Sequence, residues 1–163
     1  MIVVMIGLAV YHVADEEDMM KMFLAVAFVL ATSAVMMADG VPTKVTYVPH
    51  DTAAATFVKG GQIIGDKGLV MLANRRGAGE VEVHEKTNHI FIVIEGEAMF
   101  VTGGTLVGAK QTAPGQTRAP NVEGGTTYHL SKGDVITVPA KTPHWFKEVS
   151  TPTIAYYAIN LEP

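Results

Sequence analysis

The sequence has no cysteine among its 163 residues, and charged residues make up only 17% of it. The missing thiols exclude disulfides, thiolate metal ligands and cysteine nucleophiles together. The 12 lysines and arginines form no cluster or stripe, and the formal net charge is -4. A nucleic-acid-binding surface needs a concentration of positive charge. We therefore expect no nucleic-acid partner and no site built on a thiol.

The first 38 residues form an unusually apolar segment with the layout of a secretory signal peptide. Lys21 precedes an apolar run from Met22 to Ala31, and small residues follow at positions 32–34. The sequence therefore predicts export to the periplasm or the medium, with no stable membrane insertion once the segment is removed. Cleavage is expected after Ser33, Ala34 or Ala38.

Within these 38 residues, those ahead of Met20 are harder to interpret, because they add a second apolar run at 1–11 and an acidic stretch at 15–18. The simplest interpretation is that translation starts near Met20 and that residues 1–18 do not belong to the protein. One alternative is an uncleaved membrane anchor, since residues 19–37 nearly reach the roughly 20 residues that span a bilayer. A cytoplasmic protein is the other alternative.

Residues 39–163 are expected to form a single all-β domain. Short segments rich in β-branched and aromatic residues are bounded by Gly, Pro, Asn or Asp, and no sustained helical period follows Asp39. Many short strands with tight turns are typical of a sandwich or barrel. The segment 103–125 is long for a connection, and a hairpin, a mobile flap and a disordered excursion all remain open. The strands are expected at 45–48, 56–58, 69–72, 81–84, 90–94, 98–102, 126–130, 135–138, 145–149 and 153–159.

Two segments of this region resemble the paired motifs of the cupin superfamily. Residues 82–96 are similar to the pattern G-x5-HxH-x3,4-E-x6-G, and residues 133–148 are similar to G-x5-PxG-x2-H-x3-N. The resemblance implies a cupin double-stranded β-barrel of the jelly-roll type over most of residues 45–163. It also implies a metal ion at the mouth of the barrel.

Several positions depart from these patterns. Glu82 stands at the first His of the first motif and His89 at its Glu, so two members of the family's ligand set are exchanged. Lys141 stands at the Gly of the second motif and Glu148 at its closing Asn, while the leading Gly of the first motif is shifted to Gly77. The resemblance then gives the metal ligands as Glu82, His84, His89 and His144.

Imidazole and carboxylate ligands suit one divalent ion of Mn, Fe, Zn, Ni or Cu in an open site. Glu82 and His84 are two residues apart on an expected strand, so both point to the same face. Two alternatives stay open. Three histidines alone hold the metal and Glu82 is a catalytic base, or the barrel has lost its metal and keeps a polar pocket.

Other residues receive weaker interpretations. Arg75 and Arg76 precede the first motif, where a solvated turn is favoured over an anion-binding role, and His129 is interpreted as structural or exposed. Strand alternation predicts a mainly apolar lining around the metal, the usual form of a small-molecule site. The residues expected to line the interior are Phe91, Val93, Ala98, Phe100, Thr137 and Phe146.

A fold does not fix a function, and the resemblance covers many activities. The favoured hypothesis is a metal-binding cupin enzyme that acts on a small organic substrate, of the oxygenase, isomerase or lyase type. The alternative is a non-catalytic cupin of the cell envelope that binds a small ligand or a metal. A homodimer is also expected, because a strand at 45–48 would leave an exposed edge.

Overall fold

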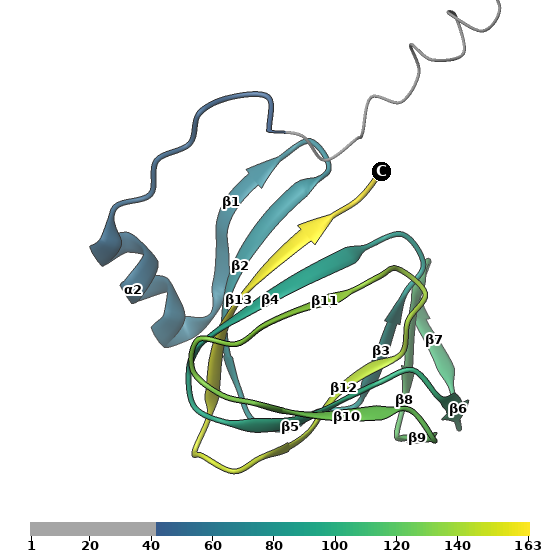
Figure 1. Ribbon diagram of the computed structural model, residues 1–163. Helices are drawn as coiled ribbons and strands as arrows, with labels where there is room; N and C mark the ends of the chain where they lie inside the picture. Colours follow the sequence, from purple (N-terminus) through teal and green to yellow (C-terminus); the bar gives the residue numbers. More distant parts are fainter. Residues whose placement is uncertain (1–41) are drawn as a thin grey trace, which may run out of the picture. The chain divides into compact units, whose positions relative to one another are not determined.

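The computed structural model describes residues 42–163, which form one short helix and thirteen strands (Figure 1). The helix is α2 (His50–Lys59). The strands are β1 (Gly61–Asp66), β2 (Leu69–Arg76), β3 (Val81–His84), β4 (Asn88–Glu95), β5 (Ala98–Thr102), β6 (Thr105–Val107), β7 (Lys110–Ala113), β8 (Gln116–Ala119), β9 (Asn121–Glu123), β10 (Thr126–Leu130), β11 (Val135–Val138), β12 (His144–Val149) and β13 (Ile154–Leu161).

Two antiparallel sheets make up the body of the domain. One has the strand order β1-β2-β13-β4-β11, the other has the order β10-β5-β12-β3-β8-β7, and β6 and β9 form a separate pair. Neighbours in each sheet are mostly distant in sequence, so the chain passes repeatedly from one sheet to the other (Figure 1). This architecture confirms the all-β barrel predicted from the sequence.

The core lies between the two sheets and follows the alternation of the strands. Phe91 and Val93 enter it from β4, and Ala98 and Phe100 enter it from β5 on the opposite sheet. Phe100 is fully buried, and burial of such a side chain stabilises the fold by roughly 1.5–3 kcal/mol. Five of the six side chains expected to line the interior therefore do so: Phe91, Val93, Ala98, Phe100 and Phe146.

The strands predicted at 45–48 and 56–58 are wrong. Residues 45–48 have no regular structure, and Val45 is 98% exposed. Residues 56–58 lie in the last turn of the helix α2, whose three consecutive alanines are strong helix formers and outweigh the β-branched Thr56 and Val58. Phe57 anchors this helix on the outer face of the first sheet, with its ring 4.8 Å from that of Tyr157.

The long segment 103–125 is ordered as hairpins, which is one of the three alternatives left open by the sequence. Strand β6 pairs with β9, and β7 pairs with β8. Strand β8 also pairs with β3, which carries half of the first motif. Strands β7 and β8 of this segment are therefore part of the second sheet, whereas β6 and β9 form a pair of their own.

The predicted leader and its cleavage positions lie outside the described residues. Within residues 42–163, no helix combines the length and the hydropathy needed to cross a membrane.

Candidate metal centre

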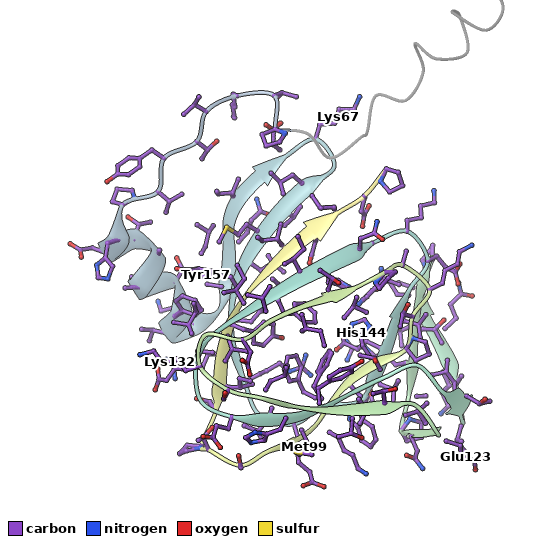
Figure 2. All side chains as sticks on the ribbon, in the orientation of Figure 1. Lys67, Met99, Glu123, Lys132, His144 and Tyr157 are labelled. Carbon is purple, nitrogen blue, oxygen red and sulfur yellow. The ribbon has the colours of Figure 1, made fainter. Side chains whose placement is uncertain are left out.

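Three histidines from three strands meet in the interior of the barrel. His84 ends β3, His89 lies near the start of β4, and His144 begins β12. One ring nitrogen of each lies within 4.8 Å of the others. His89 and His144 are buried, and Figure 2 shows His144 in the space between the sheets. The structure thus brings together the three histidines singled out from the motifs, and such a group could hold a metal ion.

Each of these histidines is oriented by an oxygen at its Nδ1. His89 Nδ1 donates to Asn160 Oδ1 over 2.8 Å, and His144 Nδ1 donates to the backbone oxygen of Thr142 over 3.0 Å. The Nδ1 of His84 contacts Gln116 Oε1 in the same way. A carbonyl oxygen can only accept, so these contacts place a hydrogen on each Nδ1, and in His89 and His144 they leave the lone pair on Nε2. This is the arrangement that metal-binding histidines adopt.

The electrostatics of the cluster also suit a metal. Burial lowers the pKa of His89, and burial together with the neighbouring His89 and His84 lowers the pKa of His144 to about 4. Both rings are therefore neutral near pH 7, as metal ligation requires. His89 Nε2 is buried and has no hydrogen-bond partner among the described residues. An unsatisfied buried polar atom costs roughly 1–3 kcal/mol, and a metal ion in the cluster would remove that cost.

Glu82, the predicted fourth ligand or base, lies at the margin of this cluster. Its Oε2 is 3.6 Å from His84 Nε2, and its Oε1 is 3.3 Å from both Arg76 Nη1 and Arg118 Nη2. Burial alone would raise the pKa of Glu82, but the contact with His84 and the charges of Arg76 and Arg118 lower it to about 2. Glu82 is thus an ionised carboxylate beside the histidines. Its two predicted roles, ligand and base, both stay predictions.

The structure adds Gln116 and Arg118, which the sequence interpretation missed, and corrects the interpretation of Arg76. Arg76 is the last residue of β2 and points inward beside Glu82, so the prediction of a solvated turn is wrong for it. Gln116 and Arg118 lie on β8, directly opposite His84 and Glu82 on β3. Their spacing of two residues was the available signal, because it places both on one face of a strand. Only the pairing of β8 with β3 shows which face that is.

Lys141, which replaces the Gly of the second motif, has the backbone conformation that favours glycine. Its φ is 66°, in the left-handed region where the family pattern has Gly, and a residue with a side chain costs roughly 1–2 kcal/mol there. Its backbone N–H donates to the backbone oxygen of His84 over 2.7 Å. The strained position therefore ties the second motif directly to a histidine of the first.

The histidines line a cavity of about 170 Å³. Polar and apolar side chains from both sheets line this cavity. The lining residues are Leu72, Asn74, Arg76, Glu82, His84, His89, Phe91, His144, Tyr156, Ala158 and Asn160.

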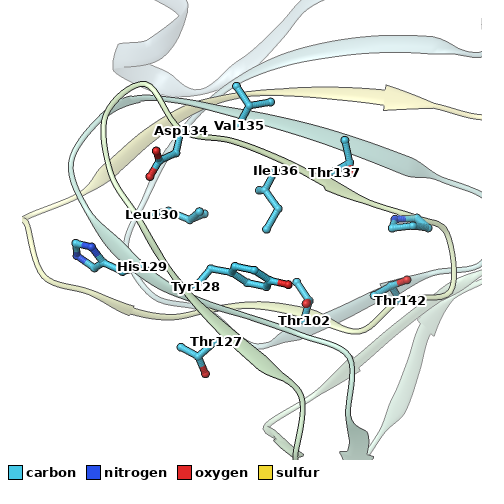
Figure 3. Close-up of a pocket in the computed structure, with 11 residues that line it drawn as sticks. Thr102, Thr127, Tyr128, His129, Leu130, Asp134, Val135, Ile136, Thr137 and Thr142 are labelled. Atoms are coloured by element: carbon cyan, nitrogen blue, oxygen red, sulfur yellow. The ribbon is translucent and has the colours of Figure 1, made fainter.

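A larger hollow of about 740 Å³ lies elsewhere, at the seam between the edge strands β10 and β11 (Figure 3). Tyr128 and Ile136 line it, and none of the three clustered histidines does. Thr137, expected to line the interior, is exposed, because Ile136 and Val138 take the inward face of β11. His129 lies at this hollow, 3.4 Å from exposed Glu97, in agreement with its structural or exposed interpretation. The candidate centre is therefore the smaller cavity.

Comparisons with known proteins agree with this architecture. The fold is similar to BH2720 from Bacillus halodurans, with 17% identity, a TM-score of 0.53, and coverage of 78% of this chain and 87% of that one. A cupin protein (BF4112) from Bacteroides fragilis shares 14% identity with a TM-score of 0.42 over 73% of this chain and 83% of that one. Hydroxypropylphosphonic acid epoxidase from S. wedmorenis shares 20% identity with a TM-score of 0.43 over 58% and 44%. At 17% identity the similarity to BH2720 shows the fold alone.

No curated protein matches the chain. A family model described as Cupin matches residues 66–163, a range that includes all three clustered histidines and both motifs. That range is more than half of the sequence. The chain belongs to the cupin family.

Proposed function

We propose that His84, His89 and His144 hold one divalent metal ion and that the protein is a metal-dependent enzyme for a small organic substrate. The observation that carries the proposal is the buried Nε2 of His89, which has no hydrogen-bond partner among the described residues and lies within a cluster of three oriented imidazoles. Mn, Fe, Zn, Ni and Cu all accept such ligands. A bound ion of this kind supplies a Lewis acid or a redox centre.

The residues of the chain prepare the site for that ion and for a substrate. Asn160, Thr142 and Gln116 fix the three imidazoles by accepting from Nδ1, so that little reorganisation is needed on binding. The Phe91 ring stacks on His89 at 5.1 Å and keeps water from one side of the cluster. Glu82 is the ionised group next to the histidines, and acts as the fourth ligand or as a general base.

A non-catalytic cupin of the cell envelope is the second candidate. The observation that favours it is the size of the cavity, which at about 170 Å³ is below the roughly 300 Å³ of common ligand pockets. A metal ion whose coordination shell has no exchangeable water would support this candidate, and turnover of a substrate by the metal-loaded protein would rule it out.

Metal analysis tests the proposal. The wild-type protein, purified without chelators and supplied in turn with Mn, Fe, Zn, Ni and Cu, should hold about one equivalent of at least one of them. His144→Ala should lose most of it, because one of three ligands is gone. His129→Ala is the matched control and should keep it. Well under one equivalent in the wild type with all five metals would leave the histidines as the lining of a polar pocket.

Glu82→Gln separates the two roles of this residue. The amide keeps the size of the side chain and removes its charge. Loss of metal assigns Glu82 as a ligand, whereas retained metal with lost turnover assigns it as the base.

Export is part of the proposal and depends on the leader-like segment near Met20. Removal of residues 20–34 should keep the protein in the cytoplasm with the barrel folded. Recovery of the uncleaved full-length chain from a soluble cytoplasmic fraction would contradict export.

A homodimer stays a prediction, although the strand at 45–48 that motivated it is absent. Among residues 42–163, no strand pairs with the outer sides of the edge strands β10 and β11, which is a remaining reason to expect association. Light scattering at tens of micromolar protein measures the mass of the particle, and a mass equal to that of one chain would refute the dimer.

A further inference from the structure

Two adjacent arginines at the end of β2 have opposite surroundings. Arg75 points to the outside, where its Nη2 lies 2.7 Å from Glu95 Oε2 in an exposed ion pair. Arg76 points into the barrel and lines the same cavity as His84, His89 and His144. Its guanidinium lies 5.9 Å from the centre of the Phe146 ring and also contacts Tyr156. Of these two arginines, only Arg76 therefore lies at the candidate metal centre.

The neighbours of Arg76 engage only some of its hydrogen-bond donors. The distance from Arg76 Nη1 to Glu82 Oε1 is 3.3 Å, longer than the roughly 2.7–2.9 Å of a charge-assisted hydrogen bond. Arg118 Nη2 contacts the same oxygen at the same distance, so one carboxylate oxygen serves two guanidiniums. A guanidinium has five N–H donors in a fixed fork, and the contacts with Glu82 and Tyr156 engage only some of them.

The charge balance of the cavity favours an anion. Arg76 and Arg118 face Glu82, and a smaller hollow that shares Arg76, Glu82 and Tyr156 adds exposed Glu80. These two carboxylates balance the two guanidiniums. A divalent ion on the histidines would then leave an excess of positive charge beside the buried His89 and His144. A carboxylate between the ion and Arg76 would neutralise it and match the guanidinium fork.

The size of the cavity limits the rest of the molecule. A volume of about 170 Å³ is too small for a nucleotide or a sugar phosphate and leaves room for an acid of a few carbon atoms. The apolar Leu72, Phe91 and Ala158 line the rest of the cavity and would contact the carbon atoms of such an acid.

We infer that Arg76 binds the carboxylate of a small organic acid at this centre, so that the substrate or ligand of the protein is such an acid. The inference rests on the proposed function for the second attachment point of the acid, the metal ion. Arg118, at the same carboxylate oxygen of Glu82, adds positive charge at the rim. Gly79 keeps room for the inner guanidinium, because a Cβ there would overlap Arg76 Nη2.

The test is calorimetric titration with malonate, and with malonamide as its uncharged counterpart. Wild type and Arg75→Gln should bind malonate equally, and both should bind malonamide at least about tenfold more weakly. Arg76→Gln should bind malonate at least about tenfold more weakly than wild type. Gly79→Ala, which keeps the arginine but displaces its guanidinium, should weaken malonate binding in the same direction. Thermal unfolding confirms that each variant is folded.

Metal content is measured on every sample, before and after treatment with EDTA. Equal metal content in wild type and Arg76→Gln assigns the loss of malonate binding to the guanidinium. If the wild type holds no metal, the proposed centre fails, and the same comparison on metal-free protein decides the role of Arg76. The inference is overturned if Arg76→Gln and Gly79→Ala bind malonate as wild type does. It is equally overturned if wild type binds none of malonate, oxalate, glycolate, pyruvate and acetate below about 10 mM.

Discussion

The polar and the apolar parts of the barrel interior are built from the same strands. On β4, His89 is followed by Phe91 and then Val93, and on β12, His144 is followed by Phe146. The rings of His89 and Phe91 stack at 5.1 Å, so the two parts are in direct contact. Alternation decides which side chains enter the interior, and position along the strand decides whether they meet the histidine cluster or the core. Stability and chemistry can therefore be perturbed separately, even between residues two apart.

Of the substitutions that test whether the two parts are separable, Phe100→Ala in the apolar part is expected to have the largest effect. Phe100 is fully buried, and its ring packs 4.6 Å from that of Phe146. The lost burial and the resulting cavity should lower the free energy of unfolding by about 3–5 kcal/mol, measured by urea denaturation. The fraction that stays folded should keep its full metal content. A loss of metal from folded Phe100→Ala would show that the two parts are not separable.

A smaller effect is expected from Gln116→Ala, which acts on the polar part alone. Gln116 accepts from His84 Nδ1, and loss of such a partner commonly weakens metal affinity by about 10–100-fold. Competition with a chromophoric chelator measures the affinity, and the melting temperature of the metal-free protein should change little. Gln111→Ala is the matched control, because Gln111 is exposed on the neighbouring strand β7. Equal affinities for the two variants would contradict the role of Gln116.

The smallest effect is expected outside the interior, at Asp66. Its side chain accepts from the backbone N–H of Thr43 at 2.6 Å and from the Thr43 hydroxyl at 2.7 Å. These contacts lower the pKa of Asp66 from 3.8 to about 2. A lowered folded-state pKa stabilises the fold above pH 3.8, and this contribution is lost as the pH falls toward 2.

Thermal melts of wild type and Asp66→Asn should therefore differ slightly at pH 6 and converge near pH 2. A difference that grows as the pH falls would refute this assignment and suggest that the substitution acts in another way.

The features that depend on local sequence were predictable. Strands 81–84, 98–102, 126–130 and 135–138 have the expected bounds, because each is a short β-branched run closed by turn residues. The three histidines come together as their motif positions imply. The helix α2 was not predicted, because the short run of apolar and β-branched residues at 56–58 is equally typical of a strand. The contact of Phe57 with Tyr157, which holds the helix against the sheet, is not visible in the sequence.

The features that depend on pairing between distant strands were not predictable. Nothing near Gln116 and Arg118 in the sequence shows that β8 lies beside β3. His84 and Gln116, which are in contact, are 32 residues apart in the sequence. The inward direction of Arg76 likewise depends on the pairing of β2 with β13, where it lies opposite Ile154. Alternation fixed that Arg75 and Arg76 point to opposite sides, and only the sheet shows which side is the inside.

The hairpin of β7 and β8 gives this barrel a means of divergence that leaves its two motifs untouched. A strand that slips by one residue turns every side chain to its other face. Deletion of one residue at the turn around Pro114 would thus turn Gln116 away from His84 and Arg118 away from Glu82, and would present Thr117 in their place. Selection or a protein engineer can therefore alter the selectivity of the cavity through the length of an exposed turn, while the histidines and the buried core keep their sequence.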